Sequence, residues 1–289
     1  MRRPVAFCLA VALAVFAAGA AWARPPIWVA HKGDATVVLF GSVHVLPPDV
    51  DWEPDALRAA IAKADDVWFE IPLDDASLQA ASRLAAQSGL QPRGRSLSRE
   101  LSPASRAKLA RVAARCGVSL AELDRLRPWL AEITLSLAVY SKVGAIKDAG
   151  VESRVDREAP AATPRRAFET AAQQIGYLAG APVADQVASL VETLSELDEG
   201  PGSYQRVVSA WMAGDATAIT DEALTPMMKQ APGEYRLLVV ARNRRWLGQI
   251  LKRLDGKGEA VMVVGVGHLV GPDSVPALLR ARGISVEGP

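Results

Sequence analysis

Two histidines of this chain occupy the same position in a motif that occurs once near each end. In residues 37–49, and again in residues 261–273, an apolar run is followed by G-x-x-H, two apolar residues and then Pro-Asp. The chain has three histidines, and His44 and His268 are the two that stand in this motif. A histidine at a glycine turn after a buried strand lies where open α/β sheets bind ligands. The repeat therefore predicts one active or metal site that is assembled from both ends of the chain.

Acidic partners for these imidazoles are predicted on two further strands. Glu70 interrupts the apolar and aromatic run Val67–Ile71, and Glu169 follows a shorter run that ends at Phe168. A buried carboxylate needs a cation, a metal or a protonated partner, because burying an unpaired charge is costly. Two histidines with one or two carboxylates suit zinc, manganese, cobalt or iron. Such a metal would lower the pKa of bound water and polarise a carbonyl.

Composition and charge exclude several other classes of protein. The chain has 289 residues, of which 50% are hydrophobic, so it can bury the core of one large domain. The net charge is +1 and no block of like charges occurs, so no nucleic-acid partner is expected. The sequence has no G-x-S-x-G elbow, P-loop or Rossmann glycine motif, which argues against the commonest serine hydrolases and nucleotide-binding proteins.

The N-terminus has the pattern of a secretory signal peptide. Arg2 and Arg3 precede the apolar run Val5–Ala20, and Ala21–Ala23 forms a small-x-small cleavage site. We therefore assign residues 1–23 to a signal peptide and residues 24–289 to the mature domain, which is expected in the periplasm or outside the cell. No later segment is apolar enough to span a membrane, so we expect no membrane span after the signal is removed.

The predicted strands lie near the two ends of the chain, and helices fill the middle. Residues 27–40 predict a hairpin and residues 67–71 a buried strand. From about residue 74 to residue 150 nearly every segment is helical, and residues 234–254 predict a long helix. We therefore expect a mixed α/β fold: a small mixed sheet from both termini, with a helical insertion at about 74–150 packed over its edge as a cap.

Four segments together resemble the TraB/GumN family: Gly41–His44, Glu70, Arg242–Trp246 and Gly265–His268. That family is related to the Tiki proteins and belongs to a wider group with erythromycin esterases and ChaN-like haem-binding proteins. The resemblance covers residues 27–286 and is strongest over the first and last fifty residues.

In the helical middle, two segments also resemble the family. Gly150–Glu152 is similar to the family's G-x-acid segment, and Phe168–Thr170 is similar to its L-E-T segment, with Phe in place of Leu. The match supports a site role for Glu169. It leaves Glu152 without an assigned role.

The resemblance implies a divalent-metal-dependent, peptidase-like hydrolase. His44, Glu70 and His268 would then form the metal and catalytic centre, with manganese, cobalt or zinc as the ion. Arg242 would orient a carboxylate or steady an oxyanion. The substrate would be a peptide or another small molecule.

Three functions remain open at this stage. A metal-dependent hydrolase would retain metal through His44 and His268. A metal-free, esterase-like hydrolase would use a histidine as general base, oriented by Glu70, and would survive chelation. A protein that binds a peptide or haem-like ligand without turnover would retain its ligand and release no product.

Overall fold

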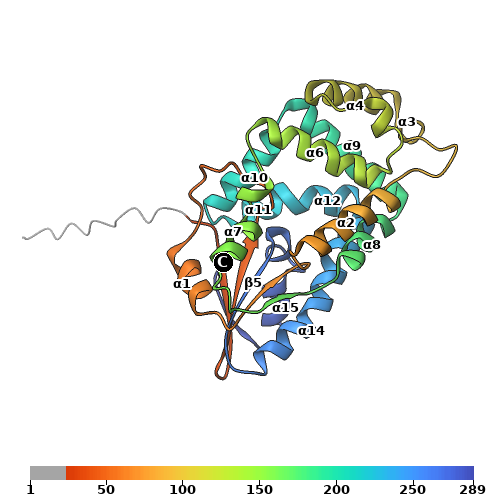
Figure 1. Cartoon of the computed structure of the whole chain (residues 1–289). Helices are drawn as coiled ribbons and strands as arrows, with labels where there is room; N and C mark the ends of the chain where they lie inside the picture. Colours follow the sequence, from red (N-terminus) through yellow and green to blue (C-terminus); the bar gives the residue numbers. More distant parts are fainter. Residues whose placement is uncertain (1–23) are drawn as a thin grey trace, which may run out of the picture.

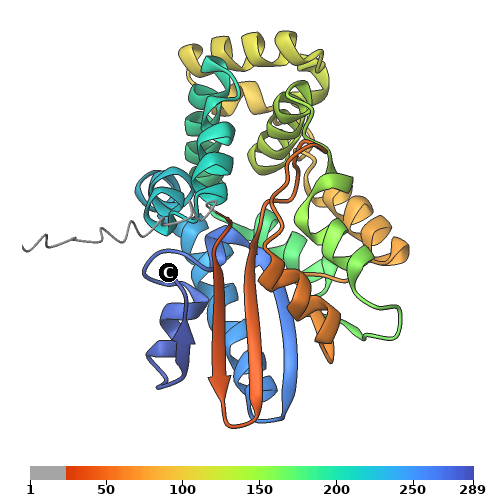
Figure 2. The same ribbon diagram turned by 90° about the vertical axis from the view of Figure 1, so that its left-hand side faces the viewer.

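The computed structural model describes residues 24–289, so the predicted signal segment lies outside the described residues. A six-stranded mixed sheet occupies the lower half of the molecule, and helices form a cap above it (Figures 1 and 2). The predicted fold class is confirmed. The strands lie in the order β4-β3-β5-β2-β1-β6, and their bounds are β1 Ile27–Lys32, β2 Ala35–Ser42, β3 Asp66–Phe69, β4 Arg165–Ala167, β5 Gly258–Gly265 and β6 Ser285–Glu287.

The two motif-bearing strands, β2 and β5, are parallel neighbours at the centre of the sheet. Their register places Gly41 opposite Val264 and Ser42 opposite Gly265. Strand β3 pairs with β5 in the same direction. Since parallel strands end at the same edge, the residues that follow β2, β3 and β5 meet there.

Strand β3 ends at Phe69, two residues before the end of the strand predicted over residues 67–71. Glu70 is the first residue after β3. Hydrogen bonding between the segments that follow β3 and β4 continues past Phe69, because Glu169 N–H donates to the carbonyl of Glu70 at 3.0 Å. On the other side, Gly265 N–H donates to the Glu70 side chain rather than to a backbone carbonyl of β3.

Helices cover both faces of the sheet. Figure 1 shows α1 (Asp55–Lys63) and α14 (Arg242–Leu254) on opposite sides of it, with α7 (Val151–Glu158) near α1 and α15 (Val275–Arg280) near α14. Leu57 and Ile61 of α1 are buried, one turn apart on the same helix face. Strand β2 supplies Phe40 to an aromatic cluster in which Trp52 stacks on it at 5.6 Å.

The cap has a hydrophobic core of its own. It contains Leu190, Leu194 and Leu197, the buried stripe of α9, which packs against α4 and α6. The cap therefore combines helices from before and after β4. Its helices are α2 Asp75–Ser88, α3 Leu97–Glu100, α4 Pro103–Cys116, α5 Leu120–Leu123, α6 Pro128–Lys142, α8 Ala171–Gly180, α9 Val183–Glu199 and α10 Gly202–Met212.

The chain returns from the cap to the sheet through a succession of helical segments. These are α11 Ala216–Ile219, η2 Thr220–Leu224, α12 Thr225–Gln230, α13 Pro232–Tyr235 and η3 Arg236–Ala241; a 3-10 turn, η1 Lys147–Ala149, precedes α7, and another, η4 Val266–His268, follows β5. Segments η2 and η3 are π-helical. Of the two, η3 lies within residues 234–254, for which the sequence predicts one regular helix. Segment η3 ends directly before Arg242. Since π-helical turns occur frequently at functional sites, this position agrees with a site role for Arg242.

Candidate active site

Gly265, the last residue of β5, lies at the point where three of the predicted site residues converge. A Cβ atom on Gly265 would lie 3.2 Å from Glu70 Oε1, 3.5 Å from His44 Nε2 and 3.7 Å from His268 Cδ2. Its N–H donates to Glu70 Oε1 at 2.7 Å. A glycine keeps this space open, because a side chain would occupy the region between the two imidazoles and the carboxylate.

Arg242 joins the two predicted carboxylates. Its Nη2 donates to Glu70 Oε2 at 2.6 Å and also to Glu169, and its Nε donates to Glu169 Oε1 at 2.8 Å. Gln174 Nε2 donates to Glu70 Oε2 at 2.9 Å. Burial opposes ionisation of Glu70, but Arg242 and the Gly265 N–H outweigh it and hold the pKa of Glu70 well below its usual range. The structure thus brings Arg242, Glu70 and Glu169 into one buried ion-pair network.

His268 is held in one tautomer by its neighbours. Asn243 Nδ2 donates to backbone carbonyls of His268 and Asp273, which leaves Asn243 Oδ1 to accept from His268 Nδ1 at 2.6 Å. Nε2 then carries the lone pair and accepts from Arg242 Nη1 at 3.1 Å. Trp246 packs against the ring, with centroids 4.4 Å apart. Burial, with the charge of Arg242, lowers the pKa of His268 to about 3, so the ring is neutral at physiological pH.

His44 has a different environment, because its side chain is 64% exposed to the cavity and solvent. Its Nδ1 donates to Glu152 Oε1 at 2.6 Å, and Ser42 Oγ donates to the same oxygen at 2.5 Å. The negative charge of Glu152 outweighs the partial desolvation of the ring inside the cavity and raises the pKa of His44 to about 9. With Nδ1 held in this way, Nε2 faces Gly265 and is the nitrogen available for proton transfer or ligation.

Glu152 is the main site residue to which sequence reasoning assigned no role. It enters the site because α7 begins against the first motif: Val151 N–H donates to the carbonyl of Val43 at 3.2 Å. A Cβ on Gly150 would lie 2.0 Å from the carbonyl oxygen of His44. Gly150 and Glu152 are therefore linked to His44 by the same close approach, and the G-x-acid spacing was the signal that could have identified them. Ser42 and Asn243 lie within motif segments but were given no role of their own, and Gln174 gave no signal.

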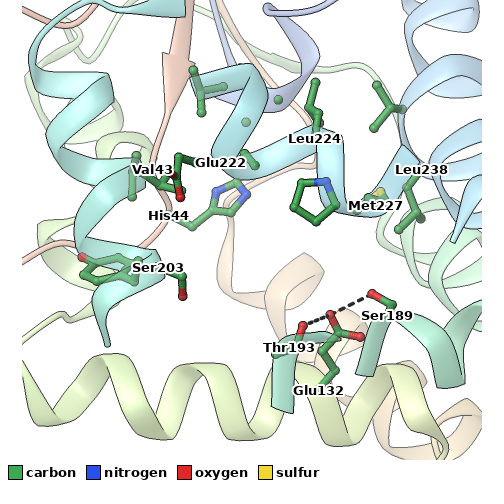
Figure 3. A pocket seen from close by; sticks show the side chains of 18 of the residues that line it. Val43, His44, Glu132, Ser189, Thr193, Ser203, Glu222, Leu224, Met227 and Leu238 are labelled. Atoms are coloured by element: carbon green, nitrogen blue, oxygen red, sulfur yellow. Dashed lines mark hydrogen bonds between the residues drawn. The ribbon is translucent and has the colours of Figure 1, made fainter. Parts of the chain in front are cut away.

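The site opens into a cavity of about 520 Å³ between the sheet edge and the cap. Its sheet end is lined by His44, Glu70, Arg242, Gly265 and His268. Figure 3 shows the His44 imidazole on one side of this cavity and Glu132, from α6, on another. A concave site of this size with converging polar groups suits a small ligand or a short segment of a longer one.

The predicted metal ligands are only partly arranged for an ion. Glu70 Oε1 and His268 Nε2 are 3.8 Å apart, slightly more than two ligands of one zinc ion. His44 donates its Nδ1 proton to a carboxylate, as metal-bound histidines do. However, the lone pair of His268 Nε2 accepts from Arg242, and residues 24–289 contain no group of three such side chains arranged to hold a metal. With Arg242 in this position, the residues do not fit a three-ligand site.

Comparison with known proteins agrees with the motifs. The model of the TraB/PrgY/gumN family matches residues 26–288, nearly the whole chain, which confirms the resemblance predicted from the sequence. None of the curated proteins and none of the solved structures matches the chain. Within residues 24–289 no helix is both long enough and apolar enough to cross a membrane.

Proposed function

The chain belongs to the TraB/PrgY/gumN family, and from this premise we propose that it is an exported hydrolase that cleaves a peptide or ester carbonyl at the sheet end of the cavity. The observation that carries the proposal is the convergence of His44, Glu70 and His268 around Gly265, with His44 Nδ1 fixed by the carboxylate of Glu152, whose side chain is 14% exposed. Export rests on the signal-like pattern of residues 1–23.

His44 is the proton-transfer group in this proposal. When the ring is neutral, Nδ1–H donates to Glu152 and the Nε2 lone pair faces the cavity, where it takes a proton from the attacking water. The same nitrogen then returns the proton to the leaving group. Glu152 keeps the ring in the required tautomer and stabilises the imidazolium that forms.

In this proposal Arg242 stabilises the developing oxyanion through Nη1, whose contact with the carbonyl of Leu238 is long at 3.4 Å and can be exchanged for the substrate. It lines the cavity, its side chain is 8% exposed, and its guanidinium is held by Glu70 and Glu169. A preorganised charge in a site of low dielectric costs little reorganisation during the reaction. The neutral ring of His268 accepts from Nη1 and helps fix the guanidinium.

A metal-dependent form of the same hydrolysis is the second candidate. It is favoured by the 3.8 Å separation of Glu70 Oε1 and His268 Nε2 and by the free Nε2 of His44. The ligands would be His44, Glu70 and His268, and manganese, cobalt or zinc would act as a Lewis acid when bound. Arg242 would have to release Nε2 of His268, and His44 would have to lose its second ring proton.

One experiment separates these candidates. Hydrolysis of a peptide and ester panel is measured for the protein and for His44→Gln and His268→Gln, with and without a chelator, alongside elemental analysis after loading with each ion. Turnover that survives chelation and is lost in His44→Gln supports the first candidate. About one ion per chain, lost in both variants together with activity, supports the second.

Absence of turnover under every condition would contradict both. Retention of a peptide or haem-like ligand without product would then identify a binding protein. Circular dichroism of each variant ensures that lost activity does not reflect unfolding.

A further inference from the structure

The cap end of the cavity differs in charge from the sheet end. Four glutamates line it, whereas the cationic side chains on the cavity wall, Arg242 and His44, belong to the sheet end, where Glu70 is paired with Arg242. The four are Glu132 from α6, Glu192 and Glu196 from α9, and Glu222 from η2. A ligand that reaches from one end to the other therefore meets opposite charges.

Three of these carboxylates make no salt bridge within residues 24–289, although the charge of Arg206 acts on Glu196 from a longer distance. Glu222 is neutralised because Arg206 Nε donates to it at 2.7 Å. Within residues 24–289, no lysine, arginine or histidine lies within 4.0 Å of the carboxylates of Glu132, Glu192 or Glu196. Negative charge that the protein leaves uncompensated on a cavity wall favours a cationic ligand.

Glu132 is held ready by neutral donors. Ser189 Oγ and Thr193 Oγ1, one turn apart on α9, donate to its Oε1 at 3.0 and 2.9 Å (Figure 3). These bonds fix the side chain but do not neutralise it. Burial raises the pKa of Glu132 to about 7, which a bound cation would reverse.

Other groups on this wall also favour an ammonium or guanidinium ligand. Tyr140 and Tyr204 stack with centroids 4.4 Å apart and line the cavity, and aromatic rings attract cations. Ser203, 9% exposed, lines the same wall near Glu196, and its Oγ has no hydrogen-bond partner within 3.5 Å among the described residues. A buried hydroxyl without a partner costs free energy unless a ligand or water satisfies it. Tyr204 also donates to the carbonyl of Val45, next to His44, so it connects the two ends.

We propose that the cap end of the cavity binds a cationic group of the substrate, an ammonium or guanidinium, while the carbonyl to be cleaved lies at His44. The inference rests on the proposed function and adds the substrate class to it: a peptide with a basic residue near the cleaved bond. Glu132 and Glu196 receive the cation, and the tyrosine pair covers its alkyl stem.

Binding without turnover tests this proposal. Two pools of end-blocked tetrapeptides share three randomised positions and carry lysine or N6-acetyllysine at the fourth. Each pool is equilibrated with the full-length protein by dialysis, and retained peptides are quantified by mass spectrometry. We expect the lysine pool to be retained at least about tenfold more, since a desolvated charge pair supplies discrimination of that order. The preference should fall about tenfold in Glu132→Gln and in Glu196→Gln.

Glu199→Gln is the matched control, because Glu199 is an exposed residue on the same helix as Glu196 and does not line the cavity. It should keep the full preference. If Glu132→Gln fails to fold by circular dichroism, Glu192→Gln replaces it. Equal retention of the two pools, no retention of either, or an unchanged preference in the cavity variants would overturn the inference. Lysine-dependent retention by a protein that hydrolyses nothing would sustain it and contradict only the proposed hydrolysis.

Discussion

Glu152 binds His44 from a position 108 residues away, with its Oε1 2.6 Å from the imidazole Nδ1. The same oxygen accepts from Ser42, which is two residues before His44. The backbone of α7 contacts the first motif directly, and Gly150 allows that contact. His44 is therefore positioned by a helix that the chain reaches only after it has built most of the cap.

Replacing Glu152 by Gln should lower the pKa of His44. The wild-type value of about 9 results mainly from the charge of Glu152, so its loss should return the imidazole toward its ordinary value of 6.5. NMR titration of the imidazole should show a decrease of at least about one unit. If the reaction requires neutral His44, its rate increases as the pH rises through the His44 pKa, and in Glu152→Gln this increase should occur at a lower pH. The maximal rate should nevertheless fall about 10²-fold, because Gln does not enforce the tautomer.

Glu158→Gln is the control for this titration, since Glu158 is on the same helix but pairs with Arg154. It should leave the His44 titration in place. An unchanged His44 pKa in Glu152→Gln would show that Glu152 does not set the protonation of His44.

Arg242 is predicted to be essential for stability as well as chemistry. Arg242→Ala leaves the carboxylates of Glu70 and Glu169 buried without their cation, which should cost roughly 3–5 kcal/mol of unfolding free energy. Arg242→Lys should recover part of this loss, because it keeps the charge but not the forked geometry. Urea unfolding measures both.

Arg244→Ala provides the comparison, because Arg244 is exposed two residues away on the same helix. It should change the free energy of unfolding by less than about 0.5 kcal/mol. A similar small change in Arg242→Ala would mean that the buried network does not contribute to folding.

The sequence predicted the edge of the sheet well, because that edge is built from short-range signals. Strand runs, glycine turns and the G-x-x-H repeat each depend on a few consecutive residues, and the parallel register of β2 and β5 then brings His44 and His268 together. Glu70 could be placed because a carboxylate in an apolar run needs a buried partner. That partner proved to be Arg242, which the resemblance indicates as a residue that orients a carboxylate.

The remaining parts of the site depend on packing that spacing does not encode. The π-helical segment η3 changes the phase of the helix just before Arg242, and an α-helical period cannot show such a shift. The G-x-acid spacing marks Gly150 and Glu152, but the contact between Glu152 and His44 depends on how α7 packs, which the spacing does not encode. The acidic wall of the cavity joins α6 to α9, and no local pattern links Glu132 with Ser189 and Thr193.

Gly265→Ala should impair activity much more than folding. The added methyl group would lie 3.2 Å from Glu70 Oε1 and 3.5 Å from His44 Nε2, in the space where a substrate atom must enter. The side chains can shift by a few tenths of an ångström, so we expect a loss of stability of about 1 kcal/mol or slightly more. The kcat/KM should fall by about 10²-fold or more, since small displacements at a reacting centre have large effects.

Two glycines test the specificity of this effect. Gly176→Ala, on α8, adds a methyl group with nothing within 4 Å and should stabilise the protein by up to about 1 kcal/mol. In Gly41→Ala, the methyl group would lie 2.7 Å from Val266 Cγ2, so stability should suffer as well as activity. Full activity in Gly265→Ala would place the reacting centre elsewhere.

Glu234 should make the protein less stable in alkali, because the residue is 5% exposed and its Oε2 has no hydrogen-bond partner among the described residues. Burial raises its pKa from 4.5 to about 8. The folded state therefore holds a proton that the unfolded state has lost, and stability falls as the pH rises from about 4.5 to about 8. Glu234→Gln removes this dependence. The variant should be more stable than the wild type by roughly 1–3 kcal/mol at pH values near 9.

Near pH 4.5 the two proteins should differ little, because the wild-type carboxyl group is then protonated in the folded state and partly protonated in the unfolded state. Urea unfolding at the two pH values gives the difference directly, with Glu199→Gln, an exposed substitution, as the control. A wild type that is as stable as Glu234→Gln in alkali would mean that the buried carboxyl group ionises without penalty. It would then need a cationic or water partner that the side chains around Glu234 do not supply.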